Sequence, residues 1–403
     1  MRRSAAILLF FLVLVSIGLF AQNNTSSPFS RFGYGELNDN VPIAYRGMGG
    51  VGIGMRSNKV INPAQPASYT SVDTTTFMFD VAASAMWSNY GNSAGYRNKA
   101  NGNLEYLTIQ FPFWKYIAFS AGVNPYSSVG YSLVDSVLTA PHPHAKVYSG
   151  MGGITQVYAG LSFNIMNWVA LGANVYYMFG DISNIRSLVF TESNLSSVVQ
   201  TSSIKVSDVR FRYGLQFFHT FADAHTVVIG GIYEHPKRLN GTFSQIESVT
   251  SDTVPVSGGS FGLPMVYGAG LSYSYKKNLT VAADFQMTNW QNTPYFGVTD
   301  SLRSRMRISV GAEYIHNPQG KHYGERMPFR FGITIADSYV KAMSDKDYTV
   351  SIGMGFPLRQ AATVLNTTIE YGHRGNVATL QENYLKLSLN VAISETWFFK
   401  RKL

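Results

Sequence analysis

The sequence contains no cysteine, few charged residues and no long apolar run beyond its first 21 positions. Without cysteine the chain forms no disulfide, and it cannot carry the acylated N-terminal cysteine of a lipoprotein. Charged residues make up 14% of the chain, whereas typical soluble domains contain about 25%. Because no second stretch of about 20 apolar residues follows, an integral helical membrane protein is disfavoured.

The first residues have the pattern of an export signal. A short basic start with Arg2 and Arg3 precedes a nearly unbroken apolar run over residues 5–20, and a polar stretch begins after Ala21. This pattern predicts a signal peptide over residues 1–21 that is cleaved near Ala21. The alternative is an N-terminal membrane anchor, for which the apolar run is somewhat short. The net charge of +9 comes from scattered residues, so we expect no nucleic-acid partner.

Aromatic residues (14%) and 37 glycines accompany the low charge, and apolar and polar side chains alternate along most of the chain. Alternation over about ten residues, bounded by turn residues, is typical of the strands of a membrane β-barrel. The clearest such segments cover residues 169–179, 209–217, 278–288, 306–314, 329–335, 348–356, 365–371 and 385–393.

Within each segment the polar residues occupy every second position, which we call the polar parity, and all charged residues lie in that set. A charged side chain facing lipid costs about 2–4 kcal/mol for Arg or Lys at the midplane, so the polar parity is predicted to face the barrel lumen. A soluble β-sandwich also alternates, but its strands are shorter and its surface carries more charge. The lumen-facing candidates are Arg210, Arg212, Asp284, Arg307, Glu313, Arg330 and Glu370, and Asp208 and Lys386 share their parity.

Short and long connections alternate between the predicted strands. Residues 164–167, 276–278 and 357–360 form tight turns, whereas residues 180–206, 240–262 and 290–301 form long polar stretches that we expect to be external loops. Trp114, Trp168 and Trp397 lie beside the predicted short turns, where an interfacial aromatic girdle is expected. The sequence therefore predicts an all-β fold, a transmembrane antiparallel barrel. About fifteen candidate strands are present, and the expected even number is fourteen, with residues 241–249 folded into an external hairpin.

The stretch "YRGMGGVGIGMRSNKVINPAQPASY" over residues 45–69 matches G-x-G-x-x-G formally. A dinucleotide-binding loop needs a buried strand before the glycines and a helix after them. A turn precedes Gly47, and no helical apolar stripe follows Gly52. A nucleotide site is therefore disfavoured, and no cofactor is expected.

This stretch instead resembles the N-terminal hatch of the FadL/TodX-type family of outer-membrane transporters for long-chain fatty acids and hydrocarbons. In that family a glycine-rich run leads into an Asn-Pro-Ala segment. The resemblance assigns hatch roles to Gly47, Gly49, Gly50, Gly52, Asn62, Pro63 and Ala64. It implies a fourteen-stranded barrel with a plugged lumen, in which small hydrophobic molecules bind and leave through an opening in the wall. We therefore expect residues 22–75 to form a periplasmic or hatch segment and residues 76–403 to form the barrel.

Two functions agree with this resemblance. One is passive uptake of hydrophobic or amphiphilic molecules through the outer membrane of a Gram-negative bacterium, which the sequence favours slightly. The other is a non-transporting barrel subunit of a larger outer-membrane machine, of the BAM type for protein assembly or of a secretion complex, since one scaffold hosts different functions. The expected partners are membrane lipids, with either a hydrophobic ligand in the lumen or other outer-membrane and periplasmic proteins.

No catalytic constellation is evident in the sequence. The nucleophile pattern G-x-S-x-G does not occur, and no Gly-Lys-Ser/Thr phosphate loop is present. His142 and His144 are close enough in sequence for a weak metal site, but no further ligand lies near them. We therefore expect neither an enzyme nor a metal protein.

Overall fold

The computed structural model describes residues 25–93, 95–137, 142–190, 195–248, 253–256, 260–295, 301–341, 345–358 and 363–396. The predicted signal peptide, Trp397 and part of the predicted turn at residues 357–360 lie outside these ranges. Strands dominate the described residues, with four short helical turns: η1 (Pro28–Arg31), α2 (Ile43–Arg46), η2 (Pro66–Ser71) and η3 (Tyr323–Arg326). None of the described helices is long and apolar enough to cross a membrane.

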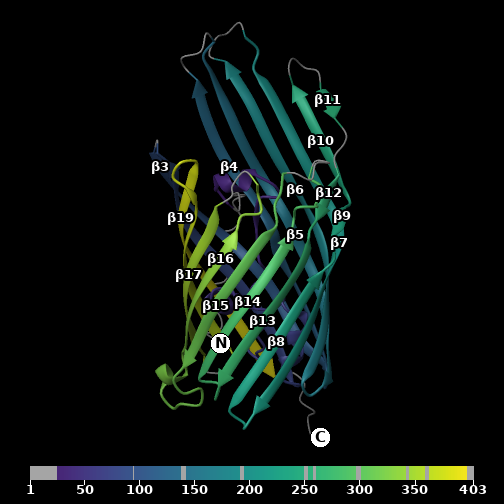
Figure 1. The fold of residues 1–403 in the computed structure, drawn as a ribbon, viewed down its shortest axis with the longest axis vertical. Coiled ribbons are helices and arrows are strands. Elements are labelled where there is room, and N and C mark those ends of the chain that lie inside the picture. The colour runs from purple at the N-terminus through teal and green to yellow at the C-terminus, as the bar shows by residue number, and fades with distance from the viewer. Residues whose placement is uncertain are drawn as a thin grey trace, which may run out of the picture.

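The strands form a closed antiparallel barrel (Figure 1). The main sheet has 17 strands, of which β1, β10 and β11 lie outside the ring, so fourteen strands of the described chain make up the wall. The predicted fold class and strand number are confirmed. The wall strands are β2 (Thr76–Asn92), β3 (Gly95–Trp114), β4 (Ile117–Val137), β5 (His144–Met166), β6 (Val169–Phe190), β7 (Val198–Phe221), β8 (His225–Glu234), β13 (Met265–Tyr275), β14 (Leu279–Asn289), β15 (Arg305–Ile315), β16 (Pro328–Asp337), β17 (Lys346–Pro357), β18 (Val364–Asn376) and β19 (Leu380–Thr396).

Each wall strand pairs with its neighbour in the chain, and two pairings complete the ring. Strand β8 pairs with β13 over the register Glu234↔Val266 to His225↔Tyr275. The first and last wall strands, β2 and β19, pair over their full lengths from Gly91↔Gln381 to Thr76↔Thr396. Closure matters physically because backbone groups that face lipid have no water to bind, and strand pairing around the ring satisfies them within the sheet wherever neighbouring strands stay paired.

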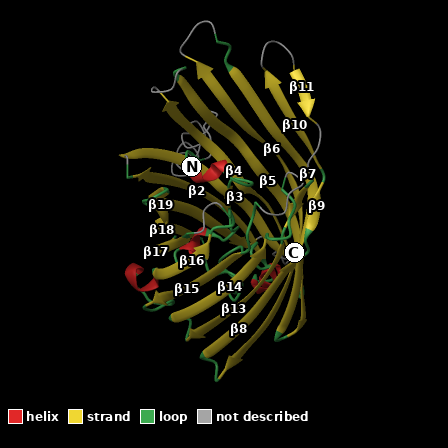
Figure 2. Cartoon of the chain, turned by 45° about the horizontal axis from the view of Figure 1, so that its top comes forward, coloured by secondary structure: helices red, strands yellow, loops and turns green. Residues whose placement is uncertain are grey.

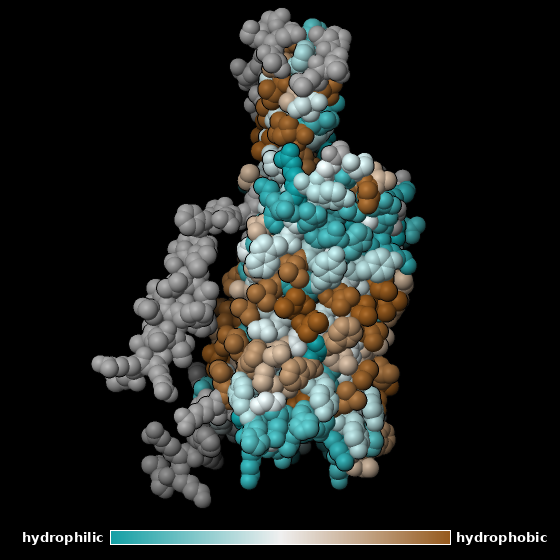
Figure 3. Space-filling model, turned by 90° about the vertical axis from the view of Figure 1, so that its left-hand side faces the viewer, coloured by the Kyte–Doolittle hydropathy of each residue, from teal (hydrophilic) through white to brown (hydrophobic). Residues whose placement is uncertain are grey.

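The period-two alternation places one set of side chains inside and the other outside. In β15, for example, Ile308 and Val310 are 40% and 48% exposed, whereas Arg307 and Ser309, which alternate with them, are buried. Figure 3 shows the result as a hydrophobic band across the barrel, with hydrophilic surface above and below it. The band is the surface that contacts the lipid chains.

The two ends of the barrel differ, as both ribbon views show (Figures 1 and 2). At one end, which we call the tight-turn end, short turns at residues 115–116, 167–168, 222–224 and 276–278 join the strands. At the other end, β4, β5, β6 and β7 extend beyond the remaining strands as a sheet that we call the tower. Strand β10 (Gly241–Ser248) pairs with β7, and β11 (Thr253–Val256) pairs with β10, so this hairpin widens the tower.

The tower corrects one prediction. Residues 180–206 were expected to form a loop, but the described part of this stretch continues β6 and β7, with paired residues from Gly180↔Val206 to Leu188↔Val198. Serine and threonine are mixed with Ile and Val in this stretch. A strand that extends beyond the lipid needs no fully apolar face, so its sequence resembles that of a polar loop. Residues 241–248 form an external hairpin strand as expected.

Candidate functional site

The barrel interior is occupied by the chain's own N-terminal segment, which we define as residues 25–73. Most of its side chains are buried, among them Ile43, Met48 and Tyr69. After residue 40 the segment passes the inner faces of β18, β17, β16, β15, β14, β13, β8, β7, β6 and β5 in turn before it leads into β2. It therefore runs around the wall as well as across the lumen.

Glycines in the wall allow this close passage. A Cβ atom at Gly332 in β16 would lie 2.0 Å from the backbone nitrogen of Gly49, and one at Gly230 in β8 would lie 2.0 Å from the carbonyl oxygen of Ile53. Real Cβ atoms do not approach other atoms so closely, so only glycine fits. Further wall glycines that face the N-terminal segment are Gly160, Gly172, Gly214, Gly268, Gly270, Gly311 and Gly353.

The glycines named for the hatch lie in the part of the segment that follows α2. Gly47 lies against Gly353 of β17, and Gly49 lies between the backbones of β15 and β16. Gly49 and Gly50 both have a φ of +70°, in the left-handed region that favours glycine. Gly50 carries the carbonyl that accepts a hydrogen bond from Arg307 at 3.0 Å. Gly52 is the first of three residues bound by one wall carboxylate.

That carboxylate belongs to Asp284 of β14. It accepts hydrogen bonds from the backbone N–H groups of Gly52 at 2.5 Å, Ile53 at 2.7 Å and Gly54 at 3.2 Å. Three successive N–H groups that converge on one acceptor form an anion-binding nest. Asp284 therefore anchors the glycine-rich run to the wall.

The Asn-Pro-Ala segment is held by hydrogen bonds to both the segment and the wall. Asn62 Nδ2 donates to the carbonyl of Gly52 at 2.8 Å. The Pro63 carbonyl accepts from Asn174 Nδ2 at 3.1 Å, and the Ala64 carbonyl accepts from Arg212 Nη1 at 3.3 Å. The asparagine thus closes a loop within the segment, while the next two residues bind β6 and β7.

The charged side chains predicted to face the lumen all lie inside the barrel, and most bind a partner there. Glu234 lies between Arg210, whose Nη1 is 2.8 Å away, and Arg212. Arg330 Nε lies 2.6 Å from Glu313, and its Nη1 donates to Asn366 at 2.8 Å. Glu234 was not among the predicted lumen residues because it ends β8, outside the alternating segments used.

Other ion pairs join the N-terminal segment to the wall. Arg46 and Lys386 both bind Glu105, at 2.8 and 2.6 Å. Arg374 binds Glu36 of the segment and also Glu382, at 2.8 Å for the latter. These networks link β1 and α2 to β3, β18 and β19.

Asp39 is the segment's anionic contact with β15. Its carboxylate lies 2.8 Å from Arg305 Nη1 and 3.4 Å from Arg307 Nε. Burial alone would raise the pKa of Asp39, but the two guanidinium groups outweigh burial and hold that pKa well below its usual range. The aspartate therefore stays ionised across the physiological pH range.

The barrel wall has a gap between β3 and β4. These strands pair only from Leu107↔Val123 to Trp114↔Ile117. Beyond this point β3 pairs only with β2, and among the described residues β4 pairs with β5 and, at two positions, with β1. Irregular register at Glu105 and at Tyr126 lies where the two strands separate.

The N-terminal segment fills this gap. Strand β1 (Glu36–Leu37) pairs with β4 through Glu36↔Ser128 and Leu37↔Ser127, and the Asn38 N–H donates to the Tyr126 carbonyl at 2.9 Å. On the other side, the Ser26 hydroxyl lies 2.7 Å from the side-chain amide of Asn101 in β3. The segment therefore connects the two edges that the wall leaves apart.

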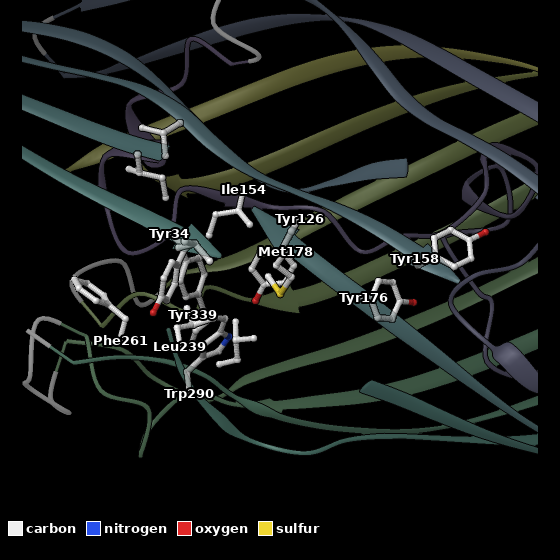
Figure 4. Packing of buried hydrophobic residues seen from close by; sticks show 14 of the residues in the cluster. Tyr34, Tyr126, Ile154, Tyr158, Tyr176, Met178, Leu239, Phe261, Trp290 and Tyr339 are labelled. Carbon is white, nitrogen blue, oxygen red and sulfur yellow. The ribbon is translucent and has the colours of Figure 1, made fainter. Parts of the chain in front are cut away.

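A cluster of buried aromatic residues packs where the N-terminal segment meets the ends of β14 and β16 (Figure 4). Tyr34 of the segment lies buried beside Trp290, with ring centroids 5.6 Å apart, and its hydroxyl donates to the Gly262 carbonyl at 2.9 Å. Gly262 belongs to β12 (Phe261–Leu263), which pairs with β9 (Lys237–Leu239) in a small separate sheet. Tyr339 also packs against Trp290, with ring centroids 5.1 Å apart and the ring planes tilted by 37°.

A cavity of about 300 Å³ remains inside the barrel, between the segment, β15 to β19 and the parts of β2, β3 and β4 next to the gap. Charged side chains lie at several points of its wall, and the predicted lumen residue Glu370 is one of them. The others are Glu36, Asp39, Arg46, Glu105, Arg305, Arg307, Asp337, Asp345, Asp347, Arg374 and Lys386. The space therefore combines charged groups with apolar surface.

Trp114 and Trp168 are exposed at the tight-turn end, at 70% and 48%. Trp168 stacks on Phe217, with ring centroids 6.1 Å apart. The third predicted girdle residue, Trp397, lies outside the described residues. Among the described side chains, no group of three or more His, Asp or Glu is gathered closely enough to hold a metal ion.

Comparison with known proteins gives two findings. The BamG family model matches residues 1–403. Solved structures of similar fold are the toluene transporter TbuX of Ralstonia pickettii (12% identity, TM-score 0.60, covering 89% of this chain and 99% of that one), the monoaromatic hydrocarbon channel CymD (14%, 0.59, 91% and 99%) and a FadL homologue of Pseudomonas aeruginosa (11%, 0.61, 90% and 100%). No curated protein matches the sequence. At these identities the likeness supports a FadL-like fold, while the matching family is BamG.

Proposed function

The chain belongs to the BamG family, and we propose that it serves as a non-transporting barrel subunit of a larger outer-membrane machine for protein assembly or secretion. One observation carries the proposal. The opening between β3 and β4 is occupied by β1 of the same chain, whereas the FadL-type family that the hatch resembles releases small molecules through an opening in the barrel wall. A barrel whose side exit is closed by its own backbone is suited to act through partners.

The contacts inside the barrel support the same function. The segment is bound to the wall by Asp284, by the ion pairs of Asp39 with Arg305 and of Glu36 with Arg374, and by close backbone passages at the wall glycines. These ion pairs are partly buried, so removing one partner leaves a poorly solvated charge inside the barrel. The charged groups in the remaining cavity disfavour a hydrophobic cargo.

In this function the barrel lies in the outer membrane, with the tight-turn end toward the periplasm and the tower on the outside. The assignment of sides follows the general rule that bacterial barrels have short periplasmic turns and longer external connections. The tower then stands where an external partner meets it, and the tight-turn end is open to periplasmic partners.

Gentle extraction at the native expression level tests the proposal. A tagged full-length chain is purified in mild detergent, and the native mass of the purified species is measured. We expect the chain in a fixed ratio with other envelope proteins. Recovery of the chain alone, at its own mass and with bound lipid or fatty acid, would count against the subunit function.

Passive uptake of hydrophobic or amphiphilic molecules is the second candidate. The fold likeness to TbuX and CymD and the separation of β3 from β4 favour it. Uptake would require the N-terminal segment to move away from β4. A disulfide between Leu37→Cys and Ser127→Cys, which are paired residues in a chain without cysteine, tests this requirement.

The two functions predict different results for this lock. Under uptake, the oxidised double variant loses entry of a hydrophobic probe such as a fluorescent fatty acid, and reduction restores it. Under the subunit function, oxidation changes neither probe entry nor the recovery of partners. The single variants Leu37→Cys and Ser127→Cys serve as matched controls.

A further inference from the structure

The tower ends in an open edge on the β4 side. Residues 129–137 of β4 pair with β5 from Val129↔Gly152 to Val137↔His144, and in the described part of the chain no strand pairs with their other side. Open edges usually carry Lys, Pro or a bulge that prevents pairing with other chains. The sequence VGYSLVDSV contains neither Lys nor Pro, its only charge is Asp135, and its register is regular.

The N-terminal segment shows which backbone groups face this edge. Asn38 binds the Tyr126 carbonyl, and the Gly130 N–H donates to the Ser30 hydroxyl at 3.0 Å. Even-numbered residues of β4 therefore direct their backbone groups to the open side. By the same alternation, the backbone N–H and C=O groups of Ser132, Val134 and Ser136 also face the open side.

The segment leaves the edge before it reaches these residues. Gly35 and Gly33 have φ values of +89° and +58°, which turn the chain away just beyond the Glu36↔Ser128 pair. A Cβ at Gly35 would lie 2.4 Å from the Ser128 carbonyl oxygen. Strand pairing along β4 thus stops at a glycine turn while the β4 edge continues.

A cavity lies beside the continuing edge. It has a volume of about 260 Å³, and Leu133 of β4 forms one wall. Pro28, Phe29 and Phe32 line it on the side of η1, and Leu380 lines it on the side of the β18–β19 hairpin. In Figure 2 the η1 helix lies beside β4 near the base of the tower. The cavity is therefore a mostly apolar space at the foot of an unpaired strand.

We propose that an extended segment of a partner protein pairs with residues 131–137 of β4 and places a bulky apolar side chain in the cavity lined by Phe29, Phe32, Leu133 and Leu380. The inference rests on the proposed function, because it names the surface by which the subunit meets its partner. Strand addition takes its affinity from backbone hydrogen bonds and its specificity from pockets for alternate side chains. Both elements are present side by side here, and a seven-residue edge matches an ordinary strand.

The side chains beside the edge define the partner segment further. Val134 of β4 and Val147 of β5 are paired residues, so they occupy the same face of the tower. Leu133 points to the opposite face, toward the cavity. A partner strand that continues both faces carries β-branched aliphatic residues at one parity and one large apolar residue at the other.

Hydrogen exchange of the tagged full-length chain tests the pairing. Amide exchange in residues 130–137 is measured by mass spectrometry for the complex purified from native membranes and for the chain purified alone. We expect exchange in the complex to be slowed about ten-fold or more. Val134→Pro removes an edge-facing donor and leaves the bonds to β5, so recovery of the partner should fall about ten-fold.

Val189→Lys is the matched control. Val189 lies on β6 in the interior of the tower and is exposed, so this change adds a surface charge without touching the β4 edge and should leave partner recovery unchanged. Heat-modifiability of each variant on a gel checks that the barrel is closed.

Each outcome has one meaning. A complex with protected β4 amides that Val134→Pro disrupts supports strand addition. The inference is overturned if residues 130–137 exchange as fast in the complex as in the chain alone and Val134→Pro recovers as much partner as the unchanged protein. That result leaves the subunit function standing. A native mass of two copies of this chain, with β4 protected, assigns the edge to self-association and also overturns it. A chain recovered alone overturns both.

Discussion

Gly49 of the N-terminal segment and Gly332 of β16 touch backbone to backbone, so that a Cβ atom at Gly332 would lie 2.0 Å from the Gly49 nitrogen. The same methyl group would lie 2.1 Å from the Met48 carbonyl carbon. Neither neighbour is a flexible side chain. The contact therefore fixes how close the segment lies to the wall.

Gly332→Ala is expected to weaken the attachment of the segment. The added methyl must displace either the segment or the strand, and overpacking of this kind costs about 1–3 kcal/mol. We expect a lower thermal midpoint in detergent and faster protease cleavage within residues 45–60. Gly231→Ala is the control, since the nearest atom to a Cβ there is 3.9 Å away. Equal midpoints for the two variants would show that the segment is not held at this contact.

Asp284→Asn is expected to loosen the glycine-rich run. The amide keeps the shape of the carboxylate but loses its charge, and its NH2 group replaces one of the two oxygens that accept from Gly52, Ile53 and Gly54. At least one of these backbone donors then faces another donor. Leaving buried donors without an acceptor costs about 1–3 kcal/mol. Leakage of a small polar dye into liposomes that contain the barrel should rise, and Asp208→Asn, whose partner is Lys237 on the tower side, provides the comparison. Unchanged leakage would argue against the run as a barrier.

Val281→Arg is expected to impair insertion of the barrel, whereas Thr280→Arg is not. Val281 is 42% exposed on the outer face of β14, near the start of the strand, and an arginine that faces lipid costs about 2–4 kcal/mol at the midplane and less toward the interfaces. Thr280 is its neighbour on the lumen parity, where a charge meets water and polar groups. The folded fraction after refolding into lipid, read from heat-modifiability, measures the difference. Similar losses for both variants would contradict the assigned faces.

Acid should release the Asp39 contact only at low pH. Because the folded pKa of Asp39 is lowered, its ion pair with Arg305 contributes stability above the unfolded pKa of about 3.9, and that contribution is lost as the pH falls through the folded pKa. The thermal midpoint of the unchanged protein should exceed that of Asp39→Asn by a constant amount from pH 8 to pH 5, and the difference should shrink below about pH 4. A difference that already declines between pH 7 and pH 5 would mean that another group titrates.

The alternation of side chains predicted the barrel because the lipid on one side and the lumen on the other impose a period of two on every strand. Charged residues such as Arg307 marked the inner parity, and the structure places them inside. The same signal ended where the lipid ends. In residues 181–190 and 198–205 apolar residues no longer occupy every second position, so the sequence predicted a loop there, although strand pairing continues through both stretches.

The contacts within the lumen were harder to foresee. The glycines at positions 47–54 stood out because they are clustered, whereas Gly230, Gly311 and Gly332 lie on separate strands far apart in the sequence. All three lie on the lumen-facing positions of their strands, which the alternation could have indicated. That they contact the same N-terminal segment becomes evident only in the folded barrel. The gap between β3 and β4 left no sequence signal, because it depends on where pairing between two regular strands stops.

The closure of the wall has a consequence for the order of assembly. The N-terminal segment precedes β2, the first wall strand, and β2 pairs with β19, the last one. A segment that contacts ten consecutive wall strands cannot easily thread into a finished cylinder. The barrel must therefore close around its own leading residues, so that the first part of the chain to be made is the template on which the last strand completes the ring.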